Sequence, residues 1–293
     1  MKQFCRILLP ILLCFGAGDS TLAQIGPPPL VTPSFFAPSR PCDGSTGGTI
    51  AVIGGYRIHT FTSSGTFTAS GNCTVSYLAV AGGGAGSLDC GAAGAGGFLQ
   101  GSASLSAGPY SITVGAGGSN FVNGGNSAID SIAIAVGGGA GSSSINGNGS
   151  AGGSGAGGNA YTGSGGAGTP GQGYNGGHGF DGTGSGEDWG GGGGGGGANG
   201  PGGNAPSISL GGTSGPGVSS SISGASVCYA GGGRGAASLQ SGSLPSAGCG
   251  GGNASTGSDA NGAANTGGGG GGRCTGTSAP GGSGIVIIAY PYP

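Results

Sequence analysis

The chain has 293 residues, of which 85 are glycine and only 5% are charged, and its formal net charge is −2. Beyond residue 23 it has no lysine, and its basic residues are Arg40, Arg57, Arg234 and Arg273. This composition excludes nucleic-acid binding, which needs a basic stripe, and a phosphate-binding loop, which needs a lysine. The glycines follow no strict Gly-X-Y period, which excludes collagen.

Residues 1–23 have the features of a secretory signal peptide. Lys2 and Arg6 form a basic start, and the apolar stretch Ile7–Phe15 follows. Small residues before the proposed cleavage point place the cut after Ala23. No later apolar stretch is long enough to span a bilayer. We therefore expect a secreted protein without a transmembrane segment.

Residues 24–48 are rich in proline and predict an extended, semi-rigid leader. Removal of the signal peptide leaves six of the eight cysteines. An even set in a secreted chain predicts three disulfides, and fifteen pairings remain open. No Cys-x-x-Cys pair suggests a metal site. The six cysteines are Cys42, Cys73, Cys90, Cys228, Cys249 and Cys274.

Residues 49–293 predict one glycine-rich β domain, with a strand-rich part at 49–136, glycine blocks at 137–280 and a closing strand within 281–293. The turn signal Ser63–Gly65 predicts a hairpin between the strands on either side of it. In the last strand of the first part, isoleucines and alanines alternate between the two faces. The expected strands are Thr49–Ile53, Tyr56–Thr62, Thr66–Thr68, Cys73–Val80, Gly97–Ser102, Ser111–Val114 and Ile132–Val136.

The glycine blocks include runs at Gly190–Gly197 and Gly267–Gly272. Bare glycine chains can adopt the threefold polyproline-II-like helix and approach one another closely enough to exchange backbone hydrogen bonds. We expect such helices in part of 137–280, interrupted by a strand at Ser223–Ala230. The apolar run Ile285–Tyr290 predicts a strand buried on both faces. The predicted fold class is an all-β, sandwich-like domain with polyglycine-II-type layers and essentially no α-helix after the signal peptide.

Motifs at Tyr56–Phe67, Tyr77–Gly84 and Ser111–Gly118, together with Ser221–Gly233 and Gly281–Ile288, resemble the glycine-rich domain of phage tail-fibre and related viral or bacterial surface proteins. The resemblance covers about residues 50–290. The chain is similar, more loosely, to polyglycine-sandwich adhesins, whose loops bind a host receptor. The resemblance therefore implies a display or adhesion module. The chain departs from the family pattern at Ala289, where family members commonly have arginine. It also departs in its six cysteines, which indicate an oxidising, extracellular setting.

Several aromatic side chains gather in otherwise glycine-rich sequence between residues 160 and 190. Aromatics on loops of a rigid scaffold suit recognition, and their faces suit sugar rings. The alternative is that they cover the glycine chains against water. The candidate ligand-binding residues are Tyr161, Tyr174, His178, Phe180 and Trp189.

The sequence gives less support to calcium binding and to catalysis. The stretch around His178 and Asp181 resembles a single calcium-binding nonapeptide, but a polar loop tip explains it better. The adjacent pair Glu187 and Asp188 is more typical of a solvated tip than of paired catalytic carboxylates. His59, beside Phe61 in a predicted strand, suggests a structural role. We expect no enzymatic activity, cofactor or metal.

The sequence thus favours a secreted scaffold for adhesion or surface display, whose loops bind a receptor or a glycan. A self-associating matrix or coat protein is the first alternative. An ice-binding protein is the second, although the irregular 137–280 region lacks the short repeats of a flat ice-binding face.

Overall fold

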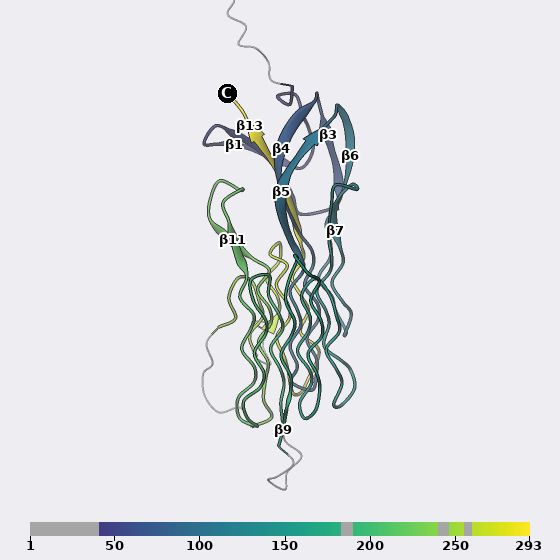
Figure 1. Cartoon of the computed structure of the whole chain (residues 1–293), viewed down its shortest axis with the longest axis vertical. Coiled ribbons are helices and arrows are strands. Elements are labelled where there is room, and N and C mark those ends of the chain that lie inside the picture. Colours follow the sequence, from purple (N-terminus) through teal and green to yellow (C-terminus); the bar gives the residue numbers. More distant parts are fainter. Residues whose placement is uncertain (1–40, 183–189, 240–245, 255–259) are drawn as a thin grey trace, which may run out of the picture. The chain divides into compact units, whose positions relative to one another are not determined.

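Figure 1 shows a computed structural model of the chain, which describes residues 41–182, 190–239, 246–254 and 260–293. The predicted signal peptide, most of the leader and residues 187–189 lie outside these ranges. The regular elements within them are β-strands, which confirms the all-β class, and no described helix is long and apolar enough to cross a membrane. The strands are β1 (Thr49–Ile53), β2 (Tyr56–Phe61), β3 (Gly65–Ala69), β4 (Cys73–Val80), β5 (Phe98–Leu105), β6 (Gly108–Thr113), β7 (Ser127–Ile129), β8 (Ala133–Ala135), β9 (Phe180–Asp181), β10 (Gly190–Gly191), β11 (Val218–Ser220), β12 (Val227–Tyr229) and β13 (Ile285–Pro291).

Two antiparallel sheets form a sandwich. The larger sheet has the order β1-β2-β13-β4-β5, and the smaller has the order β3-β6-β7-β8. Strands β7 and β8 of the smaller sheet pack against β4, β5 and β13 of the larger one. In β3, β4 and β6 the residues that enter this core alternate along the strand, as the period of a strand requires. The core between the sheets includes Phe61, Phe67, Val75, Ile112, Val286 and Ile288.

Strand β13 lies in the middle of the larger sheet, between β2 and β4. Val286, Ile288 and Tyr290 belong to the core between the sheets, whereas Ile287 and Ala289 belong to a second apolar cluster on the opposite face. All five side chains are buried. The prediction that this closing strand is buried on both faces is therefore confirmed.

The hairpin predicted around Ser63–Gly65 is wrong. β2 pairs with β1 and β13, whereas β3 pairs with β6 in the other sheet. The chain changes sheets at this turn because Phe61 and Phe67, on either side of it, both enter the core from opposite sheets. The local hairpin is instead β1–β2, whose turn uses Gly54 and Gly55 with φ of 58° and 78°.

The glycine-rich segments run side by side as extended chains (Figure 1). Within residues 92–97 the N–H groups point in turn to three different neighbours. Residues 92 and 95 donate to 193 and 196, residues 93 and 96 to 270 and 267, and residues 94 and 97 to 139 and 136. The N···O distances lie between 2.8 and 3.1 Å. A direction that repeats every third residue is the signature of the threefold polyproline-II-like helix.

The carbonyl groups of the same chain point to three further neighbours. They accept hydrogen bonds from residues 81 and 84, from 154 and 157, and from 233 and 236. The chain from Cys90 to Gly97 is thus surrounded by six others, an arrangement that satisfies its backbone without α-helix or sheet. We call this set of hydrogen-bonded threefold chains the polyglycine bundle.

The predicted glycine run Gly190–Gly197 lies in the polyglycine bundle. Its N–H groups at 192 and 195 donate to 236 and 233, those at 193 and 196 to 158 and 155, and those at 194 and 197 to 203 and 200. The expected polyglycine helices are therefore present in 137–280. They also extend to 81–97, a segment within the part predicted to be strand-rich, where glycines such as Gly83, Gly94 and Gly96 leave room for close neighbours.

Three disulfides join the six cysteines, as predicted. Cys42 pairs with Cys73, Cys90 with Cys274, and Cys228 with Cys249, at Cα–Cα distances of 6.0, 4.4 and 4.7 Å. The first ties the leader to β4. The second joins the central chain of the bundle to a segment 184 residues later.

The strand predicted at Ser223–Ala230 is shorter than expected. Only Val227–Tyr229 forms β12, and it pairs with β11, which the sequence analysis missed. Residues 221–226 form the connecting turn, where Gly224 adopts a φ of 89° that favours glycine. The resulting β11–β12 hairpin lies over the outer face of the larger sheet.

Candidate functional site

Two of the predicted aromatic residues lie together at one end of the polyglycine bundle. The Tyr161 N–H donates to the Phe180 carbonyl at 2.9 Å. The Tyr161 side chain is half-buried against a cluster containing Cys90 and Ala236. Phe180 is also half-buried, in β9. These contacts favour a packing role for Tyr161.

The remaining described candidates lie elsewhere. Tyr174 is 49% exposed, and its N–H donates to the Gly197 carbonyl. It lies on the segment that leads to Phe180, toward the opposite end of the bundle. At about 3.1 Å per residue, six residues place Tyr174 roughly 19 Å from Phe180. His178 is exposed between them, and its backbone N–H donates to Asn204. The structure does not bring these four residues into one cluster, and Trp189 lies outside the described residues.

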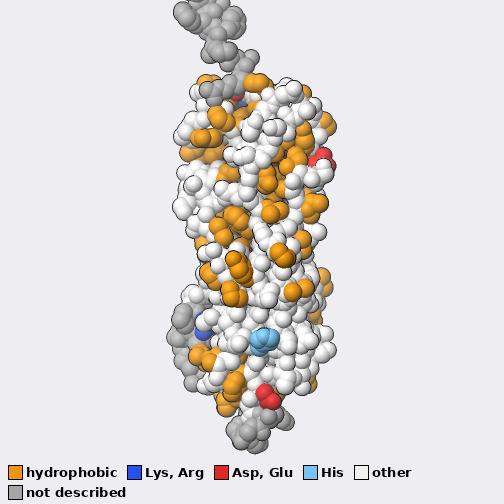
Figure 2. Space-filling view, in the orientation of Figure 1, with side chains coloured by type: hydrophobic (Ala, Val, Ile, Leu, Met, Phe, Trp, Pro, Cys, Tyr) orange, Lys and Arg blue, Asp and Glu red, His pale blue; other side chains and the backbone are white. Residues whose placement is uncertain are grey.

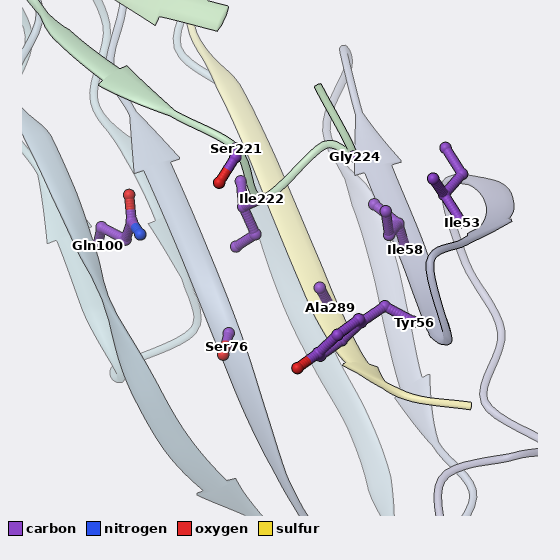
Figure 3. Close-up of a pocket in the computed structure, with 9 residues that line it drawn as sticks. All are labelled: Ile53, Tyr56, Ile58, Ser76, Gln100, Ser221, Ile222, Gly224 and Ala289. Carbon is purple, nitrogen blue, oxygen red and sulfur yellow. The ribbon is translucent and has the colours of Figure 1, made fainter. Parts of the chain in front are cut away.

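A pocket that the sequence analysis did not predict lies between the larger sheet and the β11–β12 hairpin (Figure 3). Its volume is about 330 Å³. The floor is a row of three side chains on neighbouring strands, Ile58, Ala289 and Ser76, whose pairing register places them side by side. The small Ala289 side chain at the centre of this row leaves the hollow. The other lining residues are Ile53, Tyr56, Gln100, Ser221, Ile222 and Gly224.

The pocket has an apolar side and a polar side. Figure 3 shows Ile53, Ile58 and Tyr56 on the β1–β2 side, with Gln100 and Ser76 on the opposite side. Tyr56 is 48% exposed, so its ring is open to solvent. None of the nine lining residues is an acidic or a basic residue. The arrangement can therefore bind a small neutral ligand through an aromatic face and through hydroxyl and amide groups.

The roof of the pocket is held against β1. Gly224 packs so closely on Ile53 that a Cβ added at Gly224 would lie 2.9 Å from Ile53 Cγ2. The left-handed φ of Gly224 favours glycine at this position. The hairpin therefore has a defined position over the sheet rather than a free one.

His59 lies on the other face of β2 and is fully buried. Its Nδ1 is 2.7 Å from the Gly47 carbonyl and its Nε2 is 3.0 Å from the Tyr290 hydroxyl. The neutral imidazole satisfies both contacts, because Nδ1–H donates to the carbonyl and Nε2 accepts from the hydroxyl. Burial lowers the pKa of His59, and the nearby Arg57 lowers it further, while the hydrogen bond to Gly47 acts in the opposite direction. These contacts give His59 a packing role.

The lowered pKa of His59 predicts a loss of stability in acid. Between the folded pKa and the unfolded value of about 6.5, the unfolded chain binds more protons, so the free energy of unfolding falls as the pH falls. The slope from this one group reaches at most about 1.4 kcal/mol per pH unit. We expect His59→Gln to be less stable at neutral pH and to lose this part of the slope. Urea unfolding of both proteins at several pH values measures this difference. If the free energy of unfolding of the variant has the same pH dependence, the lowered pKa of His59 is contradicted.

The loop that resembles a calcium nonapeptide has a different structure. Asp181 lies in β9 and pairs with Gly190. Among the described residues, no three His, Cys, Asp or Glu side chains gather to hold a metal ion. The carboxylates of Glu187 and Asp188 lie outside the described residues.

The pocket escaped sequence reasoning because its residues come from six separate segments. Ser76 and Gln100 occupy ordinary outward-facing strand positions, and nothing in their local sequence marks them. The available signal was indirect. The single small residue Ala289 interrupts the large apolar side chains of the closing strand, which indicates a gap on one face.

Comparison with known proteins identifies the family of this chain. No curated protein matches the chain in sequence. The family model described as a glycine-rich domain matches residues 61–291, which include the smaller sheet, strands β4, β5 and β13 of the larger sheet, and the polyglycine bundle. Strand β1 and most of β2, with the pocket residues Ile53, Tyr56 and Ile58, precede the matched range. The match covers well over half of the chain, and this protein therefore belongs to the glycine-rich domain family.

Proposed function

We propose that this chain is an extracellular, non-enzymatic scaffold for adhesion or surface display, which presents side chains that bind a receptor or a glycan. The observation that carries the proposal is the polyglycine bundle. Its central chain has a hydrogen-bonded backbone, six neighbours and mostly glycine and alanine side chains. Such a structure offers few groups for chemistry, but it holds the segments at its ends in fixed positions, which favours recognition.

The extracellular setting rests on the disulfides and on the predicted signal peptide. Three disulfides persist in an oxidising compartment, whereas cytosolic thiols are kept reduced. The surface is also weakly charged, and the face drawn in Figure 2 has few acidic or basic side chains. This surface favours neutral partners over nucleic acid or anionic lipid. The resemblance to phage tail-fibre and adhesin domains points to the same class of function.

A self-associating matrix protein is the second candidate, and strand β1 favours it. β1 is an edge strand of the larger sheet, and all five of its residues are exposed. Ile50, Val52 and Ile53 are 39%, 55% and 45% exposed. Natural edge strands usually carry charges or proline against pairing with another chain. β1 has neither, so its edge is suited to strand addition.

One experiment separates the two candidates. The oxidised, secreted protein is applied to a panel of immobilised neutral and acidic glycans, and its sedimentation velocity is measured over a wide concentration range. The proposal predicts saturable binding by a species that does not grow with concentration. Concentration-dependent assembly without saturable binding would contradict display and support the matrix protein. The absence of both would contradict each candidate.

A further inference from the structure

We propose that the pocket between the larger sheet and the β11–β12 hairpin binds a neutral pyranose ring. The inference rests on the proposed function, because it names the ligand class that such a scaffold would recognise. It also locates the site away from the aromatic residues at 160–190 that the sequence suggested.

The size of the pocket favours a ligand of one or two rings. Pockets for small molecules usually measure about 300–1,000 Å³. The volume here, about 330 Å³, is at the lower end of this range. The hairpin bounds the pocket on one side, and it contacts β1 through Gly224 and Ile53.

The chemistry of the walls matches both faces of a sugar ring. A pyranose has an apolar C–H face and a rim of hydroxyl groups. The exposed ring of Tyr56 and the aliphatic side chains of Ile58 and Ile222 offer an apolar surface for the C–H face (Figure 3). Aromatic side chains combine such a surface with a polar tip, so the Tyr56 hydroxyl can remain hydrated.

The polar side of the pocket has unused hydrogen-bonding capacity. Within the described residues, no hydrogen bond engages the side chains of Ser76, Gln100 or Ser221, and all three are exposed. Together they offer two hydroxyls and one amide, which can both donate and accept. Sugar hydroxyls also donate and accept, so this set suits them better than it suits a purely acidic or basic group.

The absence of charge among the nine lining residues selects for a neutral ligand. Arg57 is the nearest charge along β2, but it lies on the other face of the strand, where its guanidinium donates to the Asp43 carbonyl and lies over the Tyr292 ring at 5.2 Å. A carboxylate in the pocket would lose water without gaining an ionic partner, which is costly. We therefore expect uronic acids to bind worse than the corresponding neutral sugars.

The test uses free methyl glycosides of glucose, galactose and mannose, with glucuronic acid as the charged comparison. Binding to the oxidised protein is measured by saturation-transfer NMR and titration. We expect at least one neutral glycoside to bind with its ring protons saturated, and Tyr56→Ala to weaken it about tenfold, the loss typical of a stacking aromatic. Tyr56→Phe keeps the ring and should bind nearly as well as the unaltered protein.

Ile145→Ala is the control, because Ile145 is 71% exposed and lies outside the pocket. It should leave glycoside binding unchanged. Tyr56 and Ile145 are both exposed, so neither variant should unfold the protein. Binding that survives Tyr56→Ala, or that prefers glucuronic acid, would overturn the inference.

The outcomes also separate this inference from the proposed function. If the Tyr56→Ala variant still binds the glycan panel, the display function is supported, and the inference that the pocket is the binding site is contradicted. Glycoside binding that depends on Tyr56, without any binding to the panel, supports the pocket and contradicts adhesion. If none of the neutral glycosides binds, the inference about the pocket is contradicted, whatever the glycan panel shows.

Discussion

Gly94→Ala is expected to destabilise the protein by roughly 3–6 kcal/mol, which combines overpacking with the loss of backbone hydrogen bonds. Gly94 lies in the central chain of the polyglycine bundle, and a Cβ there would overlap the Ser154 carbonyl. Its N–H donates to Gly139 and its carbonyl accepts from Gly84. A methyl group cannot enter without moving a neighbouring chain and disturbing these bonds. Guanidinium unfolding of the oxidised protein measures the loss.

Gly248→Ala is the matched control for this effect. Gly248 is exposed, its φ is not in the left-handed region, and an added Cβ would meet nothing within 4 Å. Alanine there should be neutral or stabilising by about 0.4–1 kcal/mol, because it reduces the entropy of the unfolded chain. The two substitutions are chemically identical, yet their expected effects have opposite sign. Equal unfolding midpoints for both variants would show that the bundle is not closely packed at Gly94.

Removal of the Cys90–Cys274 disulfide is the second large effect. The two cysteines are 184 residues apart, and the chain-entropy relation assigns such a crosslink about 5 kcal/mol. The double substitution Cys90→Ala with Cys274→Ala should therefore lower the free energy of unfolding by about this amount. The bond also begins the central chain of the bundle, so its loss should speed exchange of the neighbouring amides.

The matched control is the Cys228–Cys249 disulfide, which has a separation of 21 residues. The same relation assigns it about 3 kcal/mol. The alanine pair at Cys228 and Cys249 should thus cost about 2 kcal/mol less than the pair at Cys90 and Cys274. Chemical unfolding of both double variants compares them. A larger loss from the shorter crosslink would contradict the view that the long-range bond stabilises the domain most.

The strands that could be predicted from sequence are those whose own apolar residues determine which of their faces are buried. Cys73–Val80 and Ile285–Tyr290 contain enough large apolar residues to specify burial, and both are observed as strands β4 and β13. The polyglycine helices could be predicted because runs of glycine, which carry no side chain, permit neighbouring chains to pack closely. The number of disulfides followed from counting cysteines, but their pairing depends on contacts between distant segments.

The failures share one physical cause, which is that local signals do not determine which sheet or neighbour a segment joins. The turn at Ser63–Gly65 is real, but it leads from one sheet to the other. The aromatics Tyr161 and Tyr174 are close in sequence, yet the extended chain carries them toward opposite ends of the bundle. The floor of the pocket depends on the register of β2, β13 and β4, and the pocket also depends on the position of a hairpin.

Amide hydrogen exchange resolved along residues 92–97 tests the polyglycine bundle most directly. In a threefold chain with six neighbours every N–H is hydrogen-bonded, so all six consecutive amides should exchange slowly and at similar rates. A strand at a sheet edge would instead protect alternate amides. Alternating protection, or exchange of all six at unfolded-chain rates, would contradict the bundle and the scaffold that rests on it.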